Sequence, residues 1–166
     1  YGLSKYIQSS ISRVYSNYYG VKCISTKIFN PFGKLDNPKK LIPHVINNLV
    51  NNKVTNLSKC SQKRDFIGIE DICYAYKKIL LIDQKEFYMD INITSGTAIS
   101  VKTVLIKICK FLNKDQKLLN FDALPLNPFE PKVSYGSNEK INKFFKFNPI
   151  LDKSLKKYLH IYINDK

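Results

Sequence analysis

Apolar residues recur every three or four positions over the first eighteen residues. They are Leu3, Ile7, Ile11, Val14 and Tyr18. This spacing predicts an amphipathic helix, which Gly20 can end because glycine adopts the left-handed conformation easily. The next run, residues 21–29 (VKCISTKIF), is short and rich in β-branched residues and predicts a strand largely buried in a sheet. Helix, turn and buried strand in this order are half of an α/β repeat.

The rest of the chain alternates short apolar segments with polar turns. Helices are expected over residues 41–50, 71–82, 100–112, 138–145 and 152–162, strands over 64–69 and 89–93, and a short strand and turn within 53–62. Asp71, Ser100 and Asp152 stand where they can cap three of these helices. Residues 120–135 contain three prolines and predict an extended loop.

Composition indicates a folded protein. The 166 residues are 44% hydrophobic, enough for a core, and no apolar run approaches the roughly 18 residues of a membrane span. Four scattered cysteines, Cys23, Cys60, Cys73 and Cys109, form no C-x-x-C pair and predict reduced thiols in a cytoplasmic protein, with no metal site. The chain opens at Tyr1 inside a helical pattern and without a signal-like segment, so we interpret it as a fragment.

The charge raises a second class of function. Lysine and arginine number 27 against 13 acidic residues, a net charge of +14 that is compatible with binding to nucleic acid or to an anionic surface. The lysines are spread over every segment, however, and only Arg13 and Arg64 supply the guanidinium that phosphate readers favour. We therefore expect neither a nucleic-acid nor a membrane partner, and keep a basic binding module as the alternative.

One pair of residues has the spacing of a proton relay. Tyr1 and Lys5 are four residues apart, so a helix places them on one face. An ammonium one turn from a phenol favours the phenolate and suits the phenol for acid–base work. Taken alone, the spacing is a weak signal, and a surface tyrosine beside a solvated lysine is the simpler interpretation.

The Tyr1–Lys5 pair belongs to the first of five motifs that follow one another along the chain. They are residues 1–5 (YGLSK), 29–33 (FNPFG), 64–72 (RDFIGIEDI), 92–100 (NITSGTAIS) and the segment from Phe129-Glu130-Pro131 to Asn148-Pro149. Together they resemble the extended short-chain dehydrogenase/reductase family of NAD-dependent sugar-nucleotide epimerases, dehydratases and reductases. The resemblance implies an α/β fold: the C-terminal part of a Rossmann-type parallel sheet plus a smaller α/β substrate-binding region. The N-terminal dinucleotide-binding half, with its glycine-rich loop, would be missing.

The resemblance also implies site residues. Tyr1 would be the catalytic acid/base, and Lys5 would assist it and hold the ribose of an NAD or NADP cofactor. Pro31 and Phe32 would border the nicotinamide, while Asn30 and Arg64 would bind the nucleotide-sugar substrate. Two of these assignments have simpler alternatives: Asn30-Pro31 as turn residues, and Arg64-Asp65 as a local ion pair.

The resemblance extends to organisation and activity. Residues 1–33 would belong to the Rossmann-type domain and 34–166 mainly to the substrate-binding region, with about 71–93 rejoining the first domain. The resemblance favours a 4-keto reductase or 4-epimerase over a 4,6-dehydratase, whose additional acid/base pair usually lies upstream. The segment FDALP at 121–125 resembles members that act on deoxysugar nucleotides, in polysaccharide biosynthesis. We expect a homodimer at full length, a fragment that is inactive alone, and, as a further alternative, a catalytically dead family member.

Overall fold

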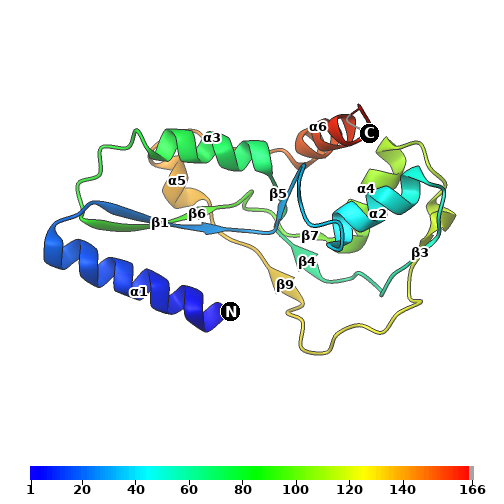
Figure 1. Cartoon of the computed structure of the whole chain (residues 1–166), viewed down its shortest axis with the longest axis horizontal. Coiled ribbons are helices and arrows are strands. Elements are labelled where there is room, and N and C mark those ends of the chain that lie inside the picture. Colours follow the sequence, from blue (N-terminus) through cyan, green and yellow to red (C-terminus); the bar gives the residue numbers. More distant parts are fainter. Residues whose placement is uncertain (165–166) are drawn as a thin grey trace.

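The computed structural model describes residues 1–164, which form two packed parts (Figure 1). In the first part, β1 (Cys23–Ile28) and β6 (Tyr88–Ile93) pair in parallel along their full length. Helix α1 (Gly2–Tyr19) lies on one side of this pair and α3 (Ile69–Ile79) on the other. The arrangement is a helix–sheet–helix layering, as expected for an α/β protein.

The second part is built on three helices. They are α2 (Leu41–Val50), α4 (Val101–Phe111) and α6 (Leu151–Asn164). Their facing sides share one core that includes fully buried Val45, Ile46, Leu105 and Leu155. A separate core, centred on Ile72, Ile91 and Ile141, joins α3 and the short α5 (Glu139–Asn142) to β6. The predicted helical spacing thus supplies the apolar faces of both cores.

Short strands connect the longer elements. They are β2 (Pro31–Phe32), β3 (Thr55–Asn56), β4 (Lys63–Arg64), β5 (Ile67–Gly68), β7 (Ile99–Ser100), β8 (Leu119–Asn120) and β9 (Val133–Ser134), with a 3-10 turn at Gln116–Leu118. β2 pairs with β5 and β3 with β8, both in parallel. β4 lies between antiparallel β7 and parallel β9. The residues that follow β1 are therefore held against the segment around residue 65.

Several expectations from the sequence are confirmed. Gly20 ends α1 with a φ of 67°, and the helix expected over 41–50 has those bounds. The Ser100 hydroxyl caps α4 by accepting a hydrogen bond from the Thr103 N–H. Residues 120–135 are mostly irregular, as their prolines predict.

Three local expectations are wrong. The strand expected over 64–69 is divided into β4 and β5, because the chain leaves one sheet at Asp65 and enters another at Ile67. The cap of α3 is Gly68 rather than Asp71, whose carboxylate lies within the first turn and accepts a hydrogen bond from Ser154. Asp152 likewise lies inside α6, where it pairs with Lys107 at 2.8 Å.

The first helix and strand are less buried than their patterns suggest. The apolar stripe of α1, from Leu3 to Tyr18, is 47–80% exposed, and no residue of β1 is fully buried. Within the described residues, β1 has a sheet neighbour on one side only, which is β6. The expectation of a largely buried strand is therefore wrong for this chain. No helix among residues 1–164 is long and apolar enough to cross a membrane.

Candidate functional site

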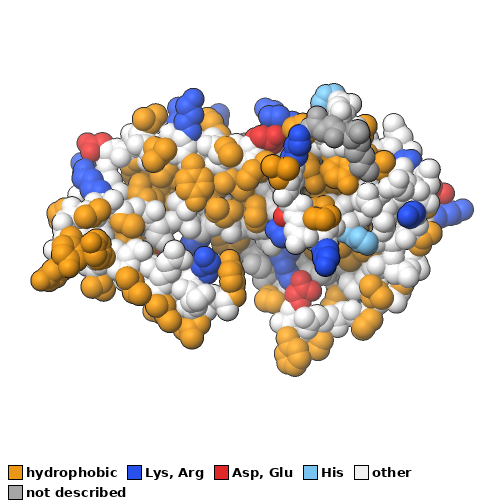
Figure 2. All heavy atoms as spheres, viewed as in Figure 1, with side chains coloured by type: hydrophobic (Ala, Val, Ile, Leu, Met, Phe, Trp, Pro, Cys, Tyr) orange, Lys and Arg blue, Asp and Glu red, His pale blue; other side chains and the backbone are white. Residues whose placement is uncertain are grey.

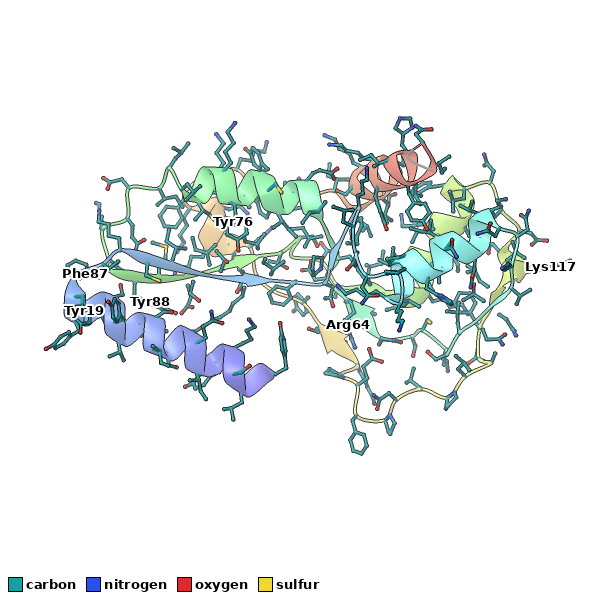
Figure 3. The ribbon with its side chains drawn as sticks, viewed as in Figure 1. Tyr19, Arg64, Tyr76, Phe87, Tyr88 and Lys117 are labelled. Carbon is teal, nitrogen blue, oxygen red and sulfur yellow. The ribbon has the colours of Figure 1, made fainter. Side chains whose placement is uncertain are left out.

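The chain crosses between its two parts at a cavity of about 340 Å³. Asn30, Pro31 and Phe32 line it immediately after β1, and Arg64 lines it from β4. The parallel pairing of β2 with β5 places Pro31 opposite Ile67 and brings the two segments together. Figure 3 shows Arg64 at this junction, far from Tyr19 and Phe87 at the other end of the β1–β6 pair. The structure thus assembles four of the six expected site residues around one cavity, beyond the carboxyl end of a parallel strand.

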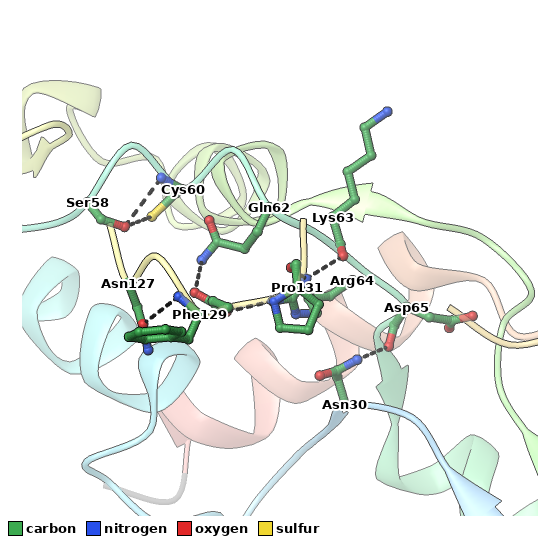
Figure 4. A network of polar contacts seen from close by, with 11 residues as sticks. Asn30, Ser58, Cys60, Gln62, Lys63, Arg64, Asp65, Asn127, Phe129 and Pro131 are labelled. Carbon is green, nitrogen blue, oxygen red and sulfur yellow. Dashed lines mark hydrogen bonds and ion pairs between the residues drawn. The ribbon is translucent and has the colours of Figure 1, made fainter. Parts of the chain in front are cut away.

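Two of these residues have clear structural roles as well. The Asn30 carboxamide donates a hydrogen bond of 2.9 Å to the Asp65 carbonyl oxygen, which fixes the turn after β1 (Figure 4). The Phe32 ring is buried and packs against Tyr158 with 6.0 Å between ring centres. Pro31, between them, is exposed. Pro31 therefore presents the exposed surface of this turn, and its neighbours anchor it.

Arg64 is held on several sides. Its Nη1 donates to the carbonyl oxygens of Lys63 and Pro131, both at 2.8 Å, and its Nη2 donates to Glu130 Oε1 at 2.6 Å. Its side chain is only 11% exposed. A guanidinium has five N–H donors, so two of them have no partner among the described residues. Arg64 pairs with Glu130, and the alternative of a local Arg64–Asp65 ion pair is wrong.

Asp65 instead organises the base of the site. Its fully buried carboxylate accepts hydrogen bonds from the Thr94 hydroxyl, the Ser95 N–H and hydroxyl, and the Gly96 N–H. The backbone before and after Asp65 carries Arg64 and β5, so this anchor positions both. Sequence analysis missed this role, although the donor-rich segment Thr94-Ser95-Gly96 is the signal that could have indicated it.

Tyr1 and Lys5 lie at the start of α1. The Lys5 ammonium is 5.6 Å from the centre of the Tyr1 ring and 3.4 Å from Gln8 Oε1. Tyr1 is 96% exposed, and neither residue lines the cavity with Asn30 and Arg64. α1 runs opposite to β1, so its first turn lies toward the same end of the molecule as the carboxyl end of β1 (Figure 1). The pair is formed, but the described chain does not bring it to the cavity.

The charges on the cavity wall come as two ion pairs. Besides Arg64 and Glu130, Lys40 pairs with Asp36 at 2.7 Å. Gln62 Nε2 donates to the second carboxylate oxygen of Glu130 at 3.3 Å. The sequence indicates Glu130 only as part of a motif and does not indicate Gln62, because the contact between these two residues spans 68 positions.

The cysteines and carboxylates elsewhere have structural environments. All four cysteines are free, and burial raises the pKa of the Cys60 and Cys109 thiols. Cys73 is exposed. The pKa of Asp90 lies below its ordinary value because, although partial burial opposes this, the Tyr88 hydroxyl and the Lys27 ammonium stabilise the carboxylate. No group of three metal-ligating side chains occurs among residues 1–164.

Lysine and arginine side chains are dispersed over the face seen in Figure 2, with apolar and uncharged surface between them. On this face they do not form the continuous basic surface that a nucleic-acid-binding protein presents to phosphates. This view gives no support to the alternative of a basic binding module.

Comparison with known proteins identifies the family. The model of the NAD dependent epimerase/dehydratase family matches residues 1–93. CDP-abequose synthase of Salmonella muenchen is 28% identical over 151 residues, which are 90% of this chain and 51% of that protein. dTDP-4-dehydro-6-deoxyglucose reductase of Escherichia coli is 33% identical over 119 residues, 69% of this chain and 37% of the relative. The chain thus spans about half the length, or less, of these relatives.

The fold comparison agrees. The structure of UDP-glucose 4-epimerase from Thermotoga maritima, with UDP-glucose, superimposes with a TM-score of 0.86 at 16% identity and covers 99% of this chain and 53% of that one. This likeness identifies the α/β elements as part of a Rossmann-type epimerase fold. The family model matches more than half of the chain, and the chain therefore belongs to the NAD dependent epimerase/dehydratase family.

Proposed function

We propose that the protein containing this chain is an NAD- or NADP-dependent enzyme that reduces or epimerises a nucleotide-linked sugar at C4. The observation that carries the proposal is the cavity that joins Asn30, Pro31, Phe32 and Arg64 beyond the carboxyl end of β1. Ligands of open α/β sheets bind at this edge. The relatives named above act on CDP- and dTDP-linked deoxysugars, which supports a substrate of this class.

The cavity has the chemistry of a nucleoside diphosphate site. Its volume of about 340 Å³ lies within the usual range for ligand sites, about 300–1,000 Å³. Leu41, Ile42 and Pro43 form an apolar side, and Arg64 supplies a guanidinium with two N–H donors left. A planar guanidinium matches the oxygens of a diphosphate. Arg64 would bind the diphosphate, and Asn30 would contact the sugar or phosphate next to it.

Lys5, Pro31 and Phe32 have the chemistry to hold a nicotinamide cofactor. The Lys5 ammonium has three N–H donors and one exposed hydrogen-bond partner, Gln8, so it is available to ribose hydroxyls. Pro31 presents an exposed surface against which the nicotinamide would lie, and buried Phe32 keeps that surface in place. The chemistry that NAD or NADP supplies when bound is hydride exchange with a sugar carbon.

The chain's own residues would handle the proton. Tyr1 would donate a proton to the C4 oxygen of the sugar during reduction and remove it during oxidation. The Lys5 ammonium, 5.6 Å from the Tyr1 ring, would stabilise the phenolate formed by that transfer. The role of both residues depends on their spacing of one helical turn, which α1 maintains.

The test measures reduction of CDP- and dTDP-linked 4-keto-6-deoxysugars by the full-length protein, followed by nicotinamide absorbance. Tyr1→Phe removes only the hydroxyl, and we expect kcat to fall about 10²- to 10⁴-fold with little change in substrate binding. Tyr15→Phe is the matched control, because Tyr15 is an exposed tyrosine on the same helix. Full activity of the Tyr1 variant would refute the relay. The activity would be refuted if the wild type neither oxidised the nicotinamide nor formed a C4 epimer from a nucleotide-linked sugar.

Three further proposals concern organisation. Residues 1–33 would belong to the cofactor domain and 34–166 mainly to the substrate region, with about 71–93 returning to the cofactor domain; the pairing of β6 with β1 supports that return. The exposed apolar stripe of α1 supports a homodimer of the full-length protein. Residues 1–166 contain no glycine-rich phosphate loop, so this chain alone would be inactive. Sedimentation of the full-length protein and an NAD-binding titration of the isolated chain test the last two.

A further inference from the structure

The charged side chains that line the cavity have formal charges that sum to zero. Its wall carries two cations, Lys40 and Arg64, and two carboxylates, Asp36 and Glu130. Each cation is in contact with a carboxylate, at 2.7 Å for the Lys40–Asp36 pair and 2.6 Å for the Arg64–Glu130 pair. A nucleoside diphosphate brings two or more negative charges. Movement of one carboxylate away from the wall would leave the site with a net positive charge toward such an anion.

The position of Glu130 resembles that of a bound anion. Arg64 Nη2 donates to Oε1 of this carboxylate, and Gln62 Nε2 donates to Oε2 (Figure 4). One donor belongs to Arg64 in β4 and the other to Gln62, directly before β4. They meet two oxygens that are bonded to the same carbon atom. A phosphoryl group presents the same arrangement of oxygens to such donors.

The donors are better fixed than the carboxylate. Arg64 stays in place through its two bonds from Nη1 to backbone carbonyls, and its side chain is 11% exposed. The Glu130 side chain is 33% exposed and belongs to the irregular, proline-containing segment 121–132. Gln62 and Arg64 are the described residues that its carboxylate contacts. Glu130 can therefore rotate into water without disturbing the donors.

We propose that the Glu130 carboxylate is an internal substitute for a phosphoryl group, which a nucleoside diphosphate displaces from Arg64 and Gln62. This rests on the proposed function, because it concerns the same ligand at the same cavity. Gln62 becomes a second phosphate-binding residue beside Arg64. Glu130 lowers the affinity for the anion, and it keeps the guanidinium charge compensated when the site is empty.

The experiment measures binding of CDP and dTDP to the full-length protein by isothermal titration calorimetry. Glu130→Gln keeps the size of the side chain and removes its charge, so the diphosphate displaces a weaker competitor. We expect Kd to fall about tenfold, the effect of removing one nearby like charge at the protein surface. Gln62→Leu removes the second donor, and we expect it to raise Kd about tenfold.

Three controls isolate the exchange. Glu70→Gln removes one negative charge from α3, where Glu70 pairs with Lys157 at 3.5 Å, and should leave Kd unchanged. The corresponding nucleosides, which lack phosphate, should bind the wild type and Glu130→Gln equally. Glu130→Ala should also tighten diphosphate binding, and circular dichroism verifies that each variant is folded.

The outcomes separate this inference from the proposed function. Tighter binding by both Glu130 variants, with Glu70→Gln unchanged, supports the exchange. Weaker or unchanged binding by the Glu130 variants overturns it, and if Arg64→Ala still weakens binding in that case, the diphosphate site itself stands. If Arg64→Ala has no effect on binding, the diphosphate site and the exchange are both refuted.

Discussion

Asp65 is the single side chain on which the geometry of the site depends most. It is fully buried and accepts four hydrogen bonds: Oδ1 from the N–H and hydroxyl of Ser95, and Oδ2 from the Gly96 N–H and the Thr94 hydroxyl. The substitution Asp65→Asn conserves volume and replaces one acceptor oxygen with an NH₂ group. It therefore tests the hydrogen bonds without creating a cavity.

The loss can be worked out bond by bond. The Thr94 and Ser95 hydroxyls can rotate and accept a hydrogen bond from the introduced NH₂ group. A backbone N–H can only donate, and one backbone N–H faces each carboxylate oxygen of Asp65. In either orientation of the introduced amide, one of these N–H groups faces another donor, which costs about 1–3 kcal/mol. The remaining three bonds lose the strengthening that an ionised acceptor gives, about 1 kcal/mol each. We expect the free energy of unfolding to fall by about 4–6 kcal/mol, a large share of the roughly 5–15 kcal/mol of a typical domain.

The assay is urea-induced unfolding of the full-length protein followed by circular dichroism. Asp83→Asn is the matched control, because the Asp83 side chain is 98% exposed and its contact with Lys22, at 3.5 Å, lies at the surface. The control should unfold at the wild-type urea concentration. A fall of less than about 1 kcal/mol for Asp65→Asn would refute the argument that unpaired buried donors dominate this region.

Two more perturbations test other contacts by thermal unfolding. Asp90→Asn removes the carboxylate that pairs with Arg13 at 3.0 Å and should cost about 1 kcal/mol at neutral pH. Because the folded pKa of Asp90 lies below its ordinary value of 3.8, this stabilisation is present above that pH and is lost as the pH falls through the folded value; a difference from the wild type that persists at pH 2 would contradict this. Gly33→Ala places a Cβ against the Ile69 side chain and should cost about 1–3 kcal/mol, whereas Gly2→Ala, which meets no neighbour, should not lower the melting temperature.

Elements with regular apolar spacing and local stop signals could be predicted from the sequence. α2 and α4 have the expected positions because their buried faces repeat at helical spacing, and Ser100 caps α4 through a bond to a residue three positions away. The start of α3 could not be found this way. Gly68 is its cap, and Asp71 accepts its hydrogen bond from Ser154, a residue 83 positions away.

The same distinction holds for the candidate site: local motifs could be predicted from the sequence, and contacts between distant segments could not. Asn30, Pro31, Phe32 and Arg64 could be assigned to one site because recognisable motifs carry them, and the structure places them around one cavity. Glu130 could not be recognised as the partner of Arg64. Their contact spans 66 residues and joins a strand to an irregular loop, so no local periodicity records it.

The packing of α1 shows that an amphipathic pattern predicts a helix reliably but does not predict which of its faces is buried. The side of α1 that meets the β1–β6 pair is polar: Ser9 lies 3.3 Å from Ser25, and Arg13 pairs with Asp90. Ser16 is buried, with its hydroxyl 2.6 Å from the Phe87 carbonyl oxygen. These residues, spaced by four and three positions, form one helical face, and the apolar stripe forms another. Polar contacts therefore orient the helix that carries Tyr1 and Lys5, and the apolar stripe is left free for the second copy of the chain in the proposed dimer.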